Sequence, residues 1–413
     1  MTPVITGLGA TTPLGGTVST TWQAALAGTS GVKPLPSQWL EQYGLPIHFA
    51  ARLAVPPQQV LPPMRHRKLD PAAQAAVVAA AEAWADAGAP EVPGERLAVV
   101  VGTGIGGVWT LLNAWDTVRE RGADRVLPMT VPMLMPNSAA ANISVELGAR
   151  AGAHTPASAC ASGAEALAWA VQLIRGGHAD VVVAGGCEAA IHPMPLAAFA
   201  KMRALSLRND DPQAASRPFS LSRDGFVMGE GAAMLVLESP EHARARGATV
   251  YANLAGVAIT ADAYDVAPPD PSGQGQRRAI ELALADADLC GSDIVHVNAH
   301  ATATPVGDGI EAAAIAQALA TAGAPCQALV SGTKSMTGHL LGGAGALETV
   351  FTVLALRDRL APPTINLDDP DPSIELRVVG DRPADLPRSG QLAALNNAFG
   401  FGGHNVALVL TSA

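Results

Sequence analysis

The chain is poor in aromatic and charged side chains. Phe, Trp and Tyr make up 4% of its 413 residues and charged residues 15%, although hydrophobic residues reach 49%. With so few large rings, the core has to be built from Ala, Val, Leu and Gly, whose small volumes allow helices and strands to pack closely. We expect one large α/β body, because no linker-like stretch rich in Ser, Pro or charge divides the chain.

Cysteine is also scarce. The four cysteines stand at irregular positions without a C-x-x-C spacing, so the sequence offers neither a disulfide framework nor a zinc site. The first residues lack the basic flank and apolar stretch of a signal peptide. Both features are typical of a cytoplasmic protein, which is the location we expect.

Long apolar runs and an excess of positive charge are missing too. Gly, His or Glu interrupts each apolar stretch before it reaches the length of a membrane span, despite a mean hydropathy of +0.24. The formal net charge of -10 argues against wholesale binding of nucleic acid or of an anionic membrane. We therefore expect no nucleic acid and no membrane among the partners.

One cysteine stands where a thiolate forms readily. Cys160 lies between a short extended run, 154–159, and an almost wholly apolar helix expected over 161–175. Unpaired N–H groups and the positive end of the helix dipole lower the pKa of a thiol at such a position, and the thiolate is the nucleophilic form. A lone cysteine is as often a buried apolar filler, so its role depends on its companions.

Two histidines lie in turns of similar character. His300 is followed by Thr302 and Thr304, whose hydroxyls at alternating positions offer a track for a polar ligand. His339 follows Gly338 and precedes further glycines, which let backbone or ligand approach closely. One thiol and two imidazoles indicate acyl transfer with carbon–carbon bond formation.

Four landmarks occur twice in the same order. Residues 4–9 correspond to 251–259, 97–107 to 294–304, 155–174 to 329–356, and 231–238 to 404–410. In each half, β-branched runs alternate with Ala-rich helical stretches, which is typical of sheets covered by helices on both faces. We expect two similar halves, 1–247 with the nucleophile and 248–413 with the histidines, whose matching turns meet at one site.

A lysine precedes the second histidine by about one helical turn. If Lys334 is buried, it needs a carboxylate, and Asp308, Glu311 and Glu348 are the candidates. A structural ion pair and a role in the site are both consistent with its position.

Glycine alternates with bulky rings in residues 396–405 near the C-terminus. In such a loop Phe399 and Phe401 are suited to cover a pocket. The N–H groups of Phe401 and Cys160 are suited to hold the oxyanion that forms when a thioester is attacked.

Residues 102–107 match the G-x-G-x-x-G spacing of a dinucleotide-binding turn. No second strand ending in an acidic residue follows at the required distance, so we do not expect nicotinamide binding. The glycines around Ile105 are equally suited to let that side chain swing at the mouth of a pocket.

Taken together, four motifs resemble those of the β-ketoacyl-[acyl carrier protein] synthases, closest to type II. They are Ser158-Ala-Cys160-Ala-Ser-Gly163, Asn298-Ala-His300-Ala-Thr302-Ala-Thr304-Pro305, Lys334-Ser-Met-Thr-Gly-His339 and Phe399-Gly-Phe401-Gly-Gly. The resemblance implies a thiolase-like five-layer αβαβα fold of two duplicated halves, acting as a homodimer. It also implies decarboxylative Claisen condensation of malonyl carrier protein with a Cys-bound acyl chain in fatty-acid elongation. The partner is acyl carrier protein, and no cofactor is needed beyond its phosphopantetheine arm.

The resemblance also implies a role for each matching residue. The nucleophile is Cys160, the catalytic histidines are His300 and His339, the active-site lysine is Lys334, the gating phenylalanine is Phe401, the residues that hold the arm or substrate are Thr302, Thr304 and Phe399, and the residue controlling the acyl tunnel is Ile105. Ala301 stands where many members have glycine, and His404 where threonine is common. Neither departure touches a reacting group, but both leave the preferred chain length open.

Three alternatives share parts of this pattern. A coenzyme A-dependent thiolase carries a second reactive cysteine in its C-terminal glycine loop, where 399–404 has none. A non-catalytic chain-length partner of a ketosynthase typically lacks the nucleophile that Cys160 supplies. A ketosynthase dedicated to a specialised polyketide or polyene pathway carries nearly the same motifs as a synthase of fatty-acid elongation, so the motifs barely distinguish the two.

An acidic carrier protein needs a local basic patch on this acidic chain. The candidates for that patch are Arg65, Arg67, Lys68, Lys201, Arg203 and Arg208.

Overall fold

The computed structural model describes residues 1–320 and 325–413. In these residues, eleven strands form one sheet in the order β12-β10-β9-β14-β15-β8-β1-β7-β6-β4-β5. The strands of the first half are β1 (Val4–Thr11), β4 (Leu97–Gly102), β5 (Gly152–His154), β6 (Val181–Glu188) and β7 (Gly231–Glu238). Those of the second half are β8 (Ala252–Ala261), β9 (Ile294–Asn298), β10 (Leu329–Ser331), β12 (Arg377–Val378), β14 (Ala393–Gly400) and β15 (His404–Ser412).

The two halves repeat one strand pattern. In the first half, β4 runs parallel to β5 and β6, and β7 is antiparallel to both β6 and β1. In the second, β9 runs parallel to β10 and β14, and β15 is antiparallel to both β14 and β8. The order β5-β4-β6-β7-β1 thus matches β10-β9-β14-β15-β8 strand for strand, as the repeated landmarks predicted. The division between residues 247 and 248 stays a prediction.

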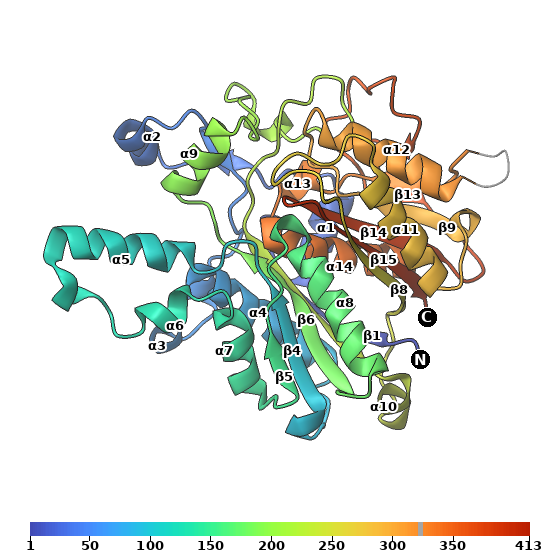
Figure 1. Ribbon diagram of the computed structural model, residues 1–413, viewed down its shortest axis with the longest axis horizontal. Helices are drawn as coiled ribbons and strands as arrows, with labels where there is room; N and C mark the ends of the chain where they lie inside the picture. The colour runs from blue at the N-terminus through green and yellow to red at the C-terminus, as the bar shows by residue number, and fades with distance from the viewer. Residues whose placement is uncertain (321–324) are drawn as a thin grey trace.

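The strands of the two halves form two layers, and helices lie between them and on both outer faces, which makes five layers in all (Figure 1). The central layer holds α8 (Ser162–Arg175) and α14 (Ala344–Asp358), which contact strands of both halves. On the outer faces lie α4 (Pro71–Asp86) and α7 (Ser138–Leu147) in the first half, and α11 (Gln274–Asp286) with α12 (Gly307–Leu319) in the second. Thirteen of the fifteen residues of α14 are buried, as a helix enclosed on all sides requires. The expected five-layer α/β fold is confirmed.

Small side chains set the distance between layers. Alanines line the face of α4 that packs on β1. A Cβ atom on Gly9 would lie 2.0 Å from the carbonyl oxygen of Ala79, and one on Gly7 would lie 2.3 Å from that of Ala83. The backbone of the helix therefore touches the backbone of the strand, which a core of few aromatics allows.

Shorter elements surround this body. The remaining helices are α1 (Val18–Leu26), α2 (Ser37–Tyr43), α3 (Pro63–His66), α5 (Val108–Arg121), α6 (Thr130–Leu134), α9 (Pro193–Lys201), α10 (Pro240–Ala245) and α13 (Lys334–Thr337). Two small sheets pair β2 (Lys33–Pro34) with β3 (Phe49–Ala50) and β11 (Leu360–Ala361) with β13 (Ala384–Asp385). The helices α5 and α6 form an arm that projects from the body (Figure 1). None of the helices described is long and apolar enough to cross a membrane.

Gly186 is a sensitive point of this packing. A Cβ atom there would lie 2.3 Å from the oxygen of Gly342 and 2.8 Å from the Cα of Gly163, at the starts of both central helices. Gly186→Ala is expected to lower the free energy of unfolding by about 1–3 kcal/mol through overpacking, measured as a lower thermal midpoint. Gly380→Ala is the control, because nothing lies within 4 Å of its Cβ position. Equal midpoints for the two variants would contradict the close approach.

Candidate active site

Cys160 lies in a short 3-10 turn, η4 (Ala159–Ala161), directly before α8. The preceding Ala159 has a left-handed φ of +51°. The Ser162 hydroxyl accepts from the N–H of Ser158 at 2.9 Å and donates to the oxygen of Ala159 at 2.6 Å. These contacts fix the sharp reversal that presents the thiol at the helix start, as predicted. The expected extended run 154–159 is wrong at its end, where Ser158 and Ala159 leave the extended conformation.

The C-terminal glycine loop packs on this turn. A Cβ atom on Gly400 would lie 2.5 Å from the Ser158 oxygen and 3.2 Å from the Cys160 nitrogen, so the β14–β15 hairpin touches the nucleophile turn through bare backbone. The N–H groups of Phe401 and of Cys160 itself both point at the Cys160 thiol. Two backbone donors therefore converge on the sulfur from opposite halves of the chain.

The thiol is neutral in this site. Burial raises the pKa of Cys160 to about 12, and the nearby charges and N–H donors do not reverse this. Lys334 and the two N–H groups lower the pKa, whereas the Glu188 carboxylate raises it further. The expectation of a lowered pKa is therefore wrong. The free-energy cost of removing a thiolate from water exceeds the stabilisation that the N–H groups at the helix start give to it. A reaction at this sulfur needs a base that takes its proton.

Both histidine turns are fixed by their backbones. The Glu311 carboxylate on α12 accepts from the N–H groups of His300 and Ala301, each at 2.7 Å. Ala301 adopts a left-handed φ of +33°, which is why glycine suits this position. The N–H of His339 donates to the oxygen of Val227 at 2.7 Å. The two rings meet edge to face with centroids 5.3 Å apart, so the imidazoles predicted from separate motifs come together.

Lys334 is buried and paired with Glu348, one of the three expected carboxylates. Asp308 instead accepts from the N–H groups of Phe219 and Ala303. The Lys334 ammonium also lies 3.4 Å from Nδ1 of His300. Because an ammonium only donates, Nδ1 accepts and the ring proton is on Nε2.

The imidazoles are neutral as well. Burial, with the Lys334 charge as the next cause, holds the pKa values of His300 and His339 well below the ordinary value. Neither ring nitrogen of His339 has a hydrogen-bond partner among the described residues. Buried polar atoms without partners are costly, so this ring is prepared for polar groups that a ligand brings.

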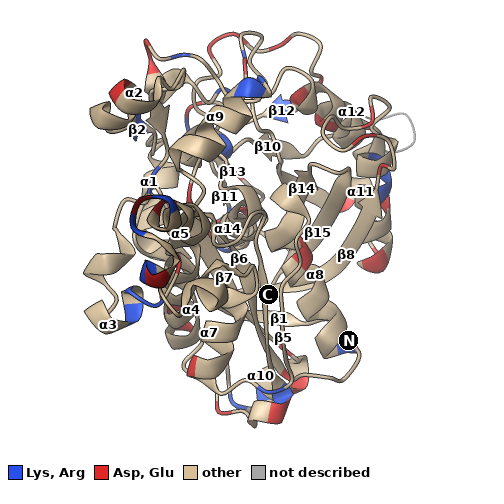
Figure 2. Cartoon of the chain, turned by 60° about the vertical axis from the view of Figure 1, so that its left-hand side comes forward, with Lys and Arg blue, Asp and Glu red and all other residues tan. Residues whose placement is uncertain are grey.

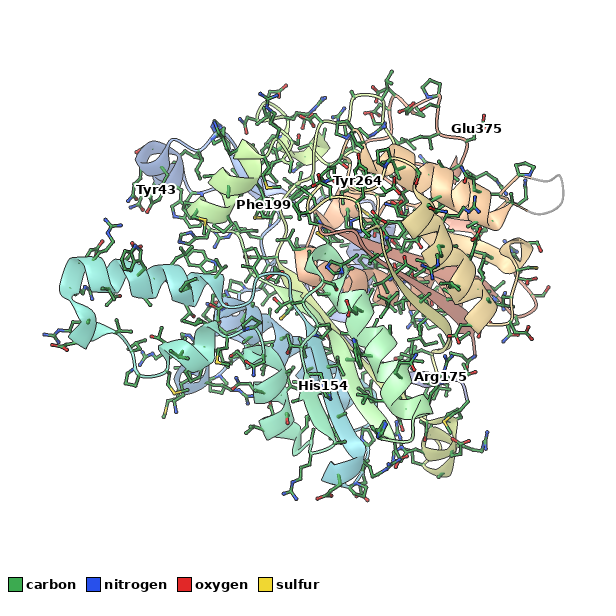
Figure 3. The ribbon with its side chains drawn as sticks, in the orientation of Figure 1. Tyr43, His154, Arg175, Phe199, Tyr264 and Glu375 are labelled. Atoms are coloured by element: carbon green, nitrogen blue, oxygen red, sulfur yellow. The ribbon has the colours of Figure 1, made fainter. Side chains whose placement is uncertain are left out.

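One cavity of about 430 Å³ joins these groups. Of the predicted site residues, it is lined by Cys160, His300, His339, Thr302, Thr304, Phe399 and Phe401. The hydroxyls of Thr302 and Thr304 lie 3.1 Å apart, and Phe199 of α9, labelled in Figure 3, contacts Phe401 with ring centroids 6.4 Å apart. Exposed Met202, Arg203 and Val306 form its rim. The size suits a slender organic ligand.

Two predicted residues do not line this cavity. Lys334 lies behind His300 and acts on the cavity through that ring. Ile105 is 40% exposed on the loop between β4 and α5. The N–H groups of Gly104 and Ile105, which a dinucleotide turn would offer to phosphate, face the Glu188 carboxylate instead.

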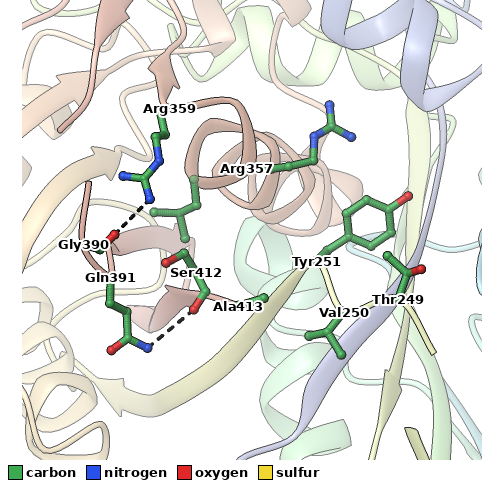
Figure 4. A pocket seen from close by; sticks show the side chains of 10 residues that line it. Thr249, Val250, Tyr251, Arg357, Arg359, Gly390, Gln391, Ser412 and Ala413 are labelled. Atoms are coloured by element: carbon green, nitrogen blue, oxygen red, sulfur yellow. Dashed lines mark hydrogen bonds between the residues drawn. The ribbon is translucent and has the colours of Figure 1, made fainter. Parts of the chain in front are cut away.

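A second pocket, of about 500 Å³, lies beside Tyr251 and the last residues of the chain (Figure 4). Both arginines that line this pocket already have partners in the chain. Arg357 pairs with Asp358, and Arg359 donates to the oxygen of Gly390. It contains none of the predicted site residues. In the part of the chain that is described, no cluster of three or more His, Cys, Asp or Glu is arranged to hold a metal ion.

Two carboxylates at the site carry roles that sequence reasoning missed. Glu311 was considered only as a partner for Lys334, yet it anchors the His300 turn. Glu188 was not considered at all. Its position in the sequence could have indicated a role, because Glu188 is a single acidic residue directly after the apolar, glycine-containing run Val181–Cys187.

Comparison with known families gives matches along most of the chain. The model described as "Beta-ketoacyl synthase, N-terminal domain" matches residues 2–243, and that described as "Beta-ketoacyl synthase, C-terminal domain" matches 251–368. The chain is 45% identical over 407 residues to 3-oxoacyl-[acyl-carrier-protein] synthase 2 of Mycobacterium tuberculosis, covering 98% of this chain and 96% of that protein. It is 42% identical over 409 residues to the protein of the same name from Staphylococcus aureus, covering 98% and 97%.

Solved structures match over the whole chain. A type II PKS acyl-carrier protein in complex with its ketosynthase bound to the hexaketide superposes with a TM-score of 0.90 at 32% identity, covering 100% of this chain and 99% of that chain. The ishigamide ketosynthase/chain length factor gives 0.89 at 30% identity, with the same coverage. A beta-ketoacyl synthase from Burkholderia phymatum gives 0.89 at 34% identity, again covering 100% and 99%.

The Lys334–Glu348 pair is testable through stability. Glu348→Gln leaves the buried ammonium without its counter-charge, so we expect a loss of about 3–5 kcal/mol in the free energy of unfolding, seen as a lower thermal midpoint. The double variant Lys334→Met/Glu348→Leu removes both charges and is expected to recover most of that loss. A double variant no more stable than Glu348→Gln would contradict a pair in which one charge compensates the other.

Proposed function

The chain belongs to the β-ketoacyl synthase family, and from this we propose that it is a β-ketoacyl-[acyl carrier protein] synthase of fatty-acid elongation. It is an acyltransferase that condenses malonyl carrier protein with an acyl chain bound to Cys160. The observation that carries the proposal is the single cavity shared by Cys160, His300 and His339. Relatives at 42–45% identity bear the name 3-oxoacyl-[acyl-carrier-protein] synthase 2, whereas the polyketide structures match at 30–32%. This favours fatty-acid elongation over a specialised pathway.

In the first step, the acyl group moves from the thioester of the carrier arm to Cys160. The neutral thiol gives its proton to a neutral imidazole as sulfur attacks the carbonyl carbon. The N–H groups of Cys160 and Phe401, which point at the sulfur in the free site, hold the oxyanion. The proton then passes to the sulfur of the departing arm, so the arm leaves as a thiol.

In the second step, malonyl carrier protein binds and loses carbon dioxide. His300 donates from Nε2, the nitrogen that bears the proton because Nδ1 faces Lys334. His339 donates to the same thioester oxygen, and the two bonds stabilise the enolate that forms as the carbon–carbon bond to CO₂ breaks. The enolate carbon attacks the acyl-Cys160 carbonyl, and the Cys160 sulfur leaves as a thiolate that takes up a proton from water. The product is a 3-oxoacyl chain two carbons longer.

The remaining site residues guide the substrates. Thr302 and Thr304 hold the phosphopantetheine arm with hydroxyls that face one another at 3.1 Å. Phe399 packs on the His300 ring with centroids 5.9 Å apart, and Phe401 gates the cavity. Ile105 controls the path of the acyl chain. No cofactor is needed beyond the arm of the carrier protein, and no metal or redox group takes part.

The protein acts as a cytoplasmic homodimer. Strand β5 lies at the edge of the sheet and pairs only with β4 among the described residues, so its other side offers backbone groups to a second copy. Val145 on α7, the helix that packs on β5, is exposed, and the projecting arm of α5 and α6 (Figure 1) exposes further large apolar side chains that a partner surface would cover. In the arm these are Leu111, Trp115, Leu127 and Val131.

Acyl carrier protein docks at the rim of the cavity through basic residues. Arg203 lines the cavity itself, and Lys201 ends the neighbouring helix α9. Figure 2 shows a second basic segment at α3, where Arg65, however, is paired with Glu146. Arg203 is therefore the strongest of the six candidates, since it is the one that lines the cavity, and no ion pair is described for it.

Cys160→Ala tests the nucleophile. The variant is expected to fold normally, form no acyl-enzyme by mass spectrometry and make no 3-oxoacyl product. It is expected to keep decarboxylating malonyl carrier protein, because His300 and His339 are unchanged. His300→Ala is the matched variant, with the opposite expectation of an acyl-enzyme but little decarboxylation. Full condensation by Cys160→Ala would falsify the assignment.

Arg203→Glu tests docking. The KM for acyl carrier protein substrates is expected to rise about tenfold or more, the scale of one charge reversal at an interface, with kcat little changed. The KM for a short acyl-pantetheine thioester is expected to stay as in the wild type. Arg388→Glu, an exposed position with 88% of its side chain accessible, is the control for overall charge. An equal rise for both substrates would place Arg203 outside the docking surface.

A further inference from the structure

The turn that carries Thr302 and Thr304 has a strained backbone. Residues 301–305 are called the threonine turn here. Ala301 and Ala303 adopt left-handed φ angles of +33° and +66°, a conformation that alanine adopts only at a cost in free energy. The hydroxyls of Thr302 and Thr304 face each other at 3.1 Å in the wall of the active-site cavity. Residues in such conformations persist only where neighbouring groups hold them, so those groups determine where the hydroxyls lie.

Arg223 holds the end of this turn. Its Nε donates to the oxygen of Thr304 at 3.2 Å, and its Nη2 donates to the oxygen of Pro305 at 3.0 Å. In the part of the chain that is described, the Pro305 oxygen has no other donor, and the Thr304 oxygen has only the N–H of Asp308, at 3.4 Å. Arg223 does not line the cavity, and only 8% of its side chain is exposed. It therefore acts on the cavity through the backbone of the turn.

Arg223 is itself fixed on its other side. Its Nη1 donates to Oδ2 of Asp371 at 2.7 Å and to the oxygen of Ser220 at 2.8 Å. The carboxylate of Asp371 also accepts from the hydroxyl and the N–H of Ser373, at 2.6 and 3.0 Å. Ser373 and Arg223 lower the pKa of Asp371 to about 2, so this pair is charged at neutral pH. The planar guanidinium is thus a rigid connection between the threonine turn and the segment 369–373.

Other groups hold the start of the threonine turn. The Glu311 carboxylate accepts from the N–H of Ala301 at 2.7 Å, and the Asp308 carboxylate accepts from the N–H of Ala303 at 3.0 Å. The N–H of Gly225 donates to the oxygen of Ala303, also at 3.0 Å. These contacts end at Ala303. Loss of the guanidinium would therefore release the second half of the turn while leaving the first half held.

We propose, on the basis of the function proposed above, that Arg223 is a positioning residue for the carrier arm. By fixing the oxygens of Thr304 and Pro305, it keeps both threonine hydroxyls directed at the amide groups of the phosphopantetheine arm. Amide N–H and C=O groups are partners that a hydroxyl can bind both as acceptor and as donor. When the guanidinium is lost, the turn relaxes from its strained conformation, and the hydroxyls leave the positions that the arm requires.

The test compares two small thioesters that carry the same butyryl group. The first is the thioester of pantetheine, which has the amides of the arm. The second is the thioester of ethanethiol, whose leaving group has no polar atom besides sulfur. The readout is the ratio of kcat/KM for acylation of Cys160, pantetheine over ethanethiol, in which the reactivity of the thiol cancels. Arg223→Met is expected to lower this ratio about tenfold, the scale of one net hydrogen bond.

A multiple variant tests whether Arg223 acts through the hydroxyls. Thr302→Val/Thr304→Val removes both hydroxyls at nearly constant volume and is expected to lower the ratio by itself. Adding Arg223→Met to this variant is expected to lower the ratio no further, because residues that act through the same contact are not additive. A second fall of about tenfold would overturn the proposed role, since Arg223 would then act by another route.

Arg217→Met is the matched control. Arg217 is a buried arginine of the same segment, and its guanidinium donates to the oxygen of Ala214 at 2.9 and 2.5 Å and to the Ser222 hydroxyl at 2.9 Å. Among the described residues it makes no hydrogen bond to the threonine turn. The ratio is therefore expected to stay as in the wild type. An equal fall in both arginine variants would assign the effect to general loosening of the segment and overturn the specific role of Arg223.

The outcomes separate this proposal from the proposed function. If butyryl carrier protein does not acylate the wild type, the function itself fails. If it does, but folded Arg223→Met keeps the wild-type ratio, the role of Arg223 is overturned. If Arg223→Met does not fold, Arg223→Lys takes its place. Lysine keeps the charge beside Asp371 but lacks the fork that reaches Thr304 and Pro305, so a smaller fall in the ratio supports the proposal and an unchanged ratio overturns it.

Discussion

Exclusion of water from the middle layer governs the chemistry of this protein. Cys160 and the two imidazoles lie where the halves meet, and burial shifts each of them toward its neutral form. The buried ammonium of Lys334 is paired with Glu348, and it fixes the tautomer of His300. The site is therefore organised for directional hydrogen bonds and proton transfers, and substrates bring the charge that it stabilises.

Small residues make that enclosed site possible. Gly400 lets the β14–β15 hairpin lie on the nucleophile turn, and Gly186 lets β6 touch the starts of α8 and α14. Each of these contacts is between two backbones. Backbone N–H groups have fixed positions, whereas long side chains can adopt several rotamers. A core packed in this way has little room for aromatic rings. Four of the seven phenylalanines line the cavity, where Phe399 contacts His300 and Phe226 contacts His339.

Much of this arrangement was predictable from the sequence because it follows from local pattern. The repeated landmarks gave the matching strand order, and the glycine turns located the thiol and both histidines. Properties set by tertiary burial were not predictable. The helix start at Cys160 suggested a lowered pKa, but desolvation raises it. Choosing Glu348 over Asp308 and Glu311 as partner of Lys334 required knowing which side chains share one interior space, and Glu188 carried no motif.

The two halves repeat one strand order but carry different reactive side chains in their turns. The thiol belongs to the first repeat and both imidazoles to the second, and the turn of Cys160, after β5, corresponds to the turn of His339, after β10. A single ancestral repeat paired with its own copy would have carried identical side chains in both turns and no division of labour. Because both repeats lie in one chain, each turn has its own side chain, a thiol in the first repeat and an imidazole in the second.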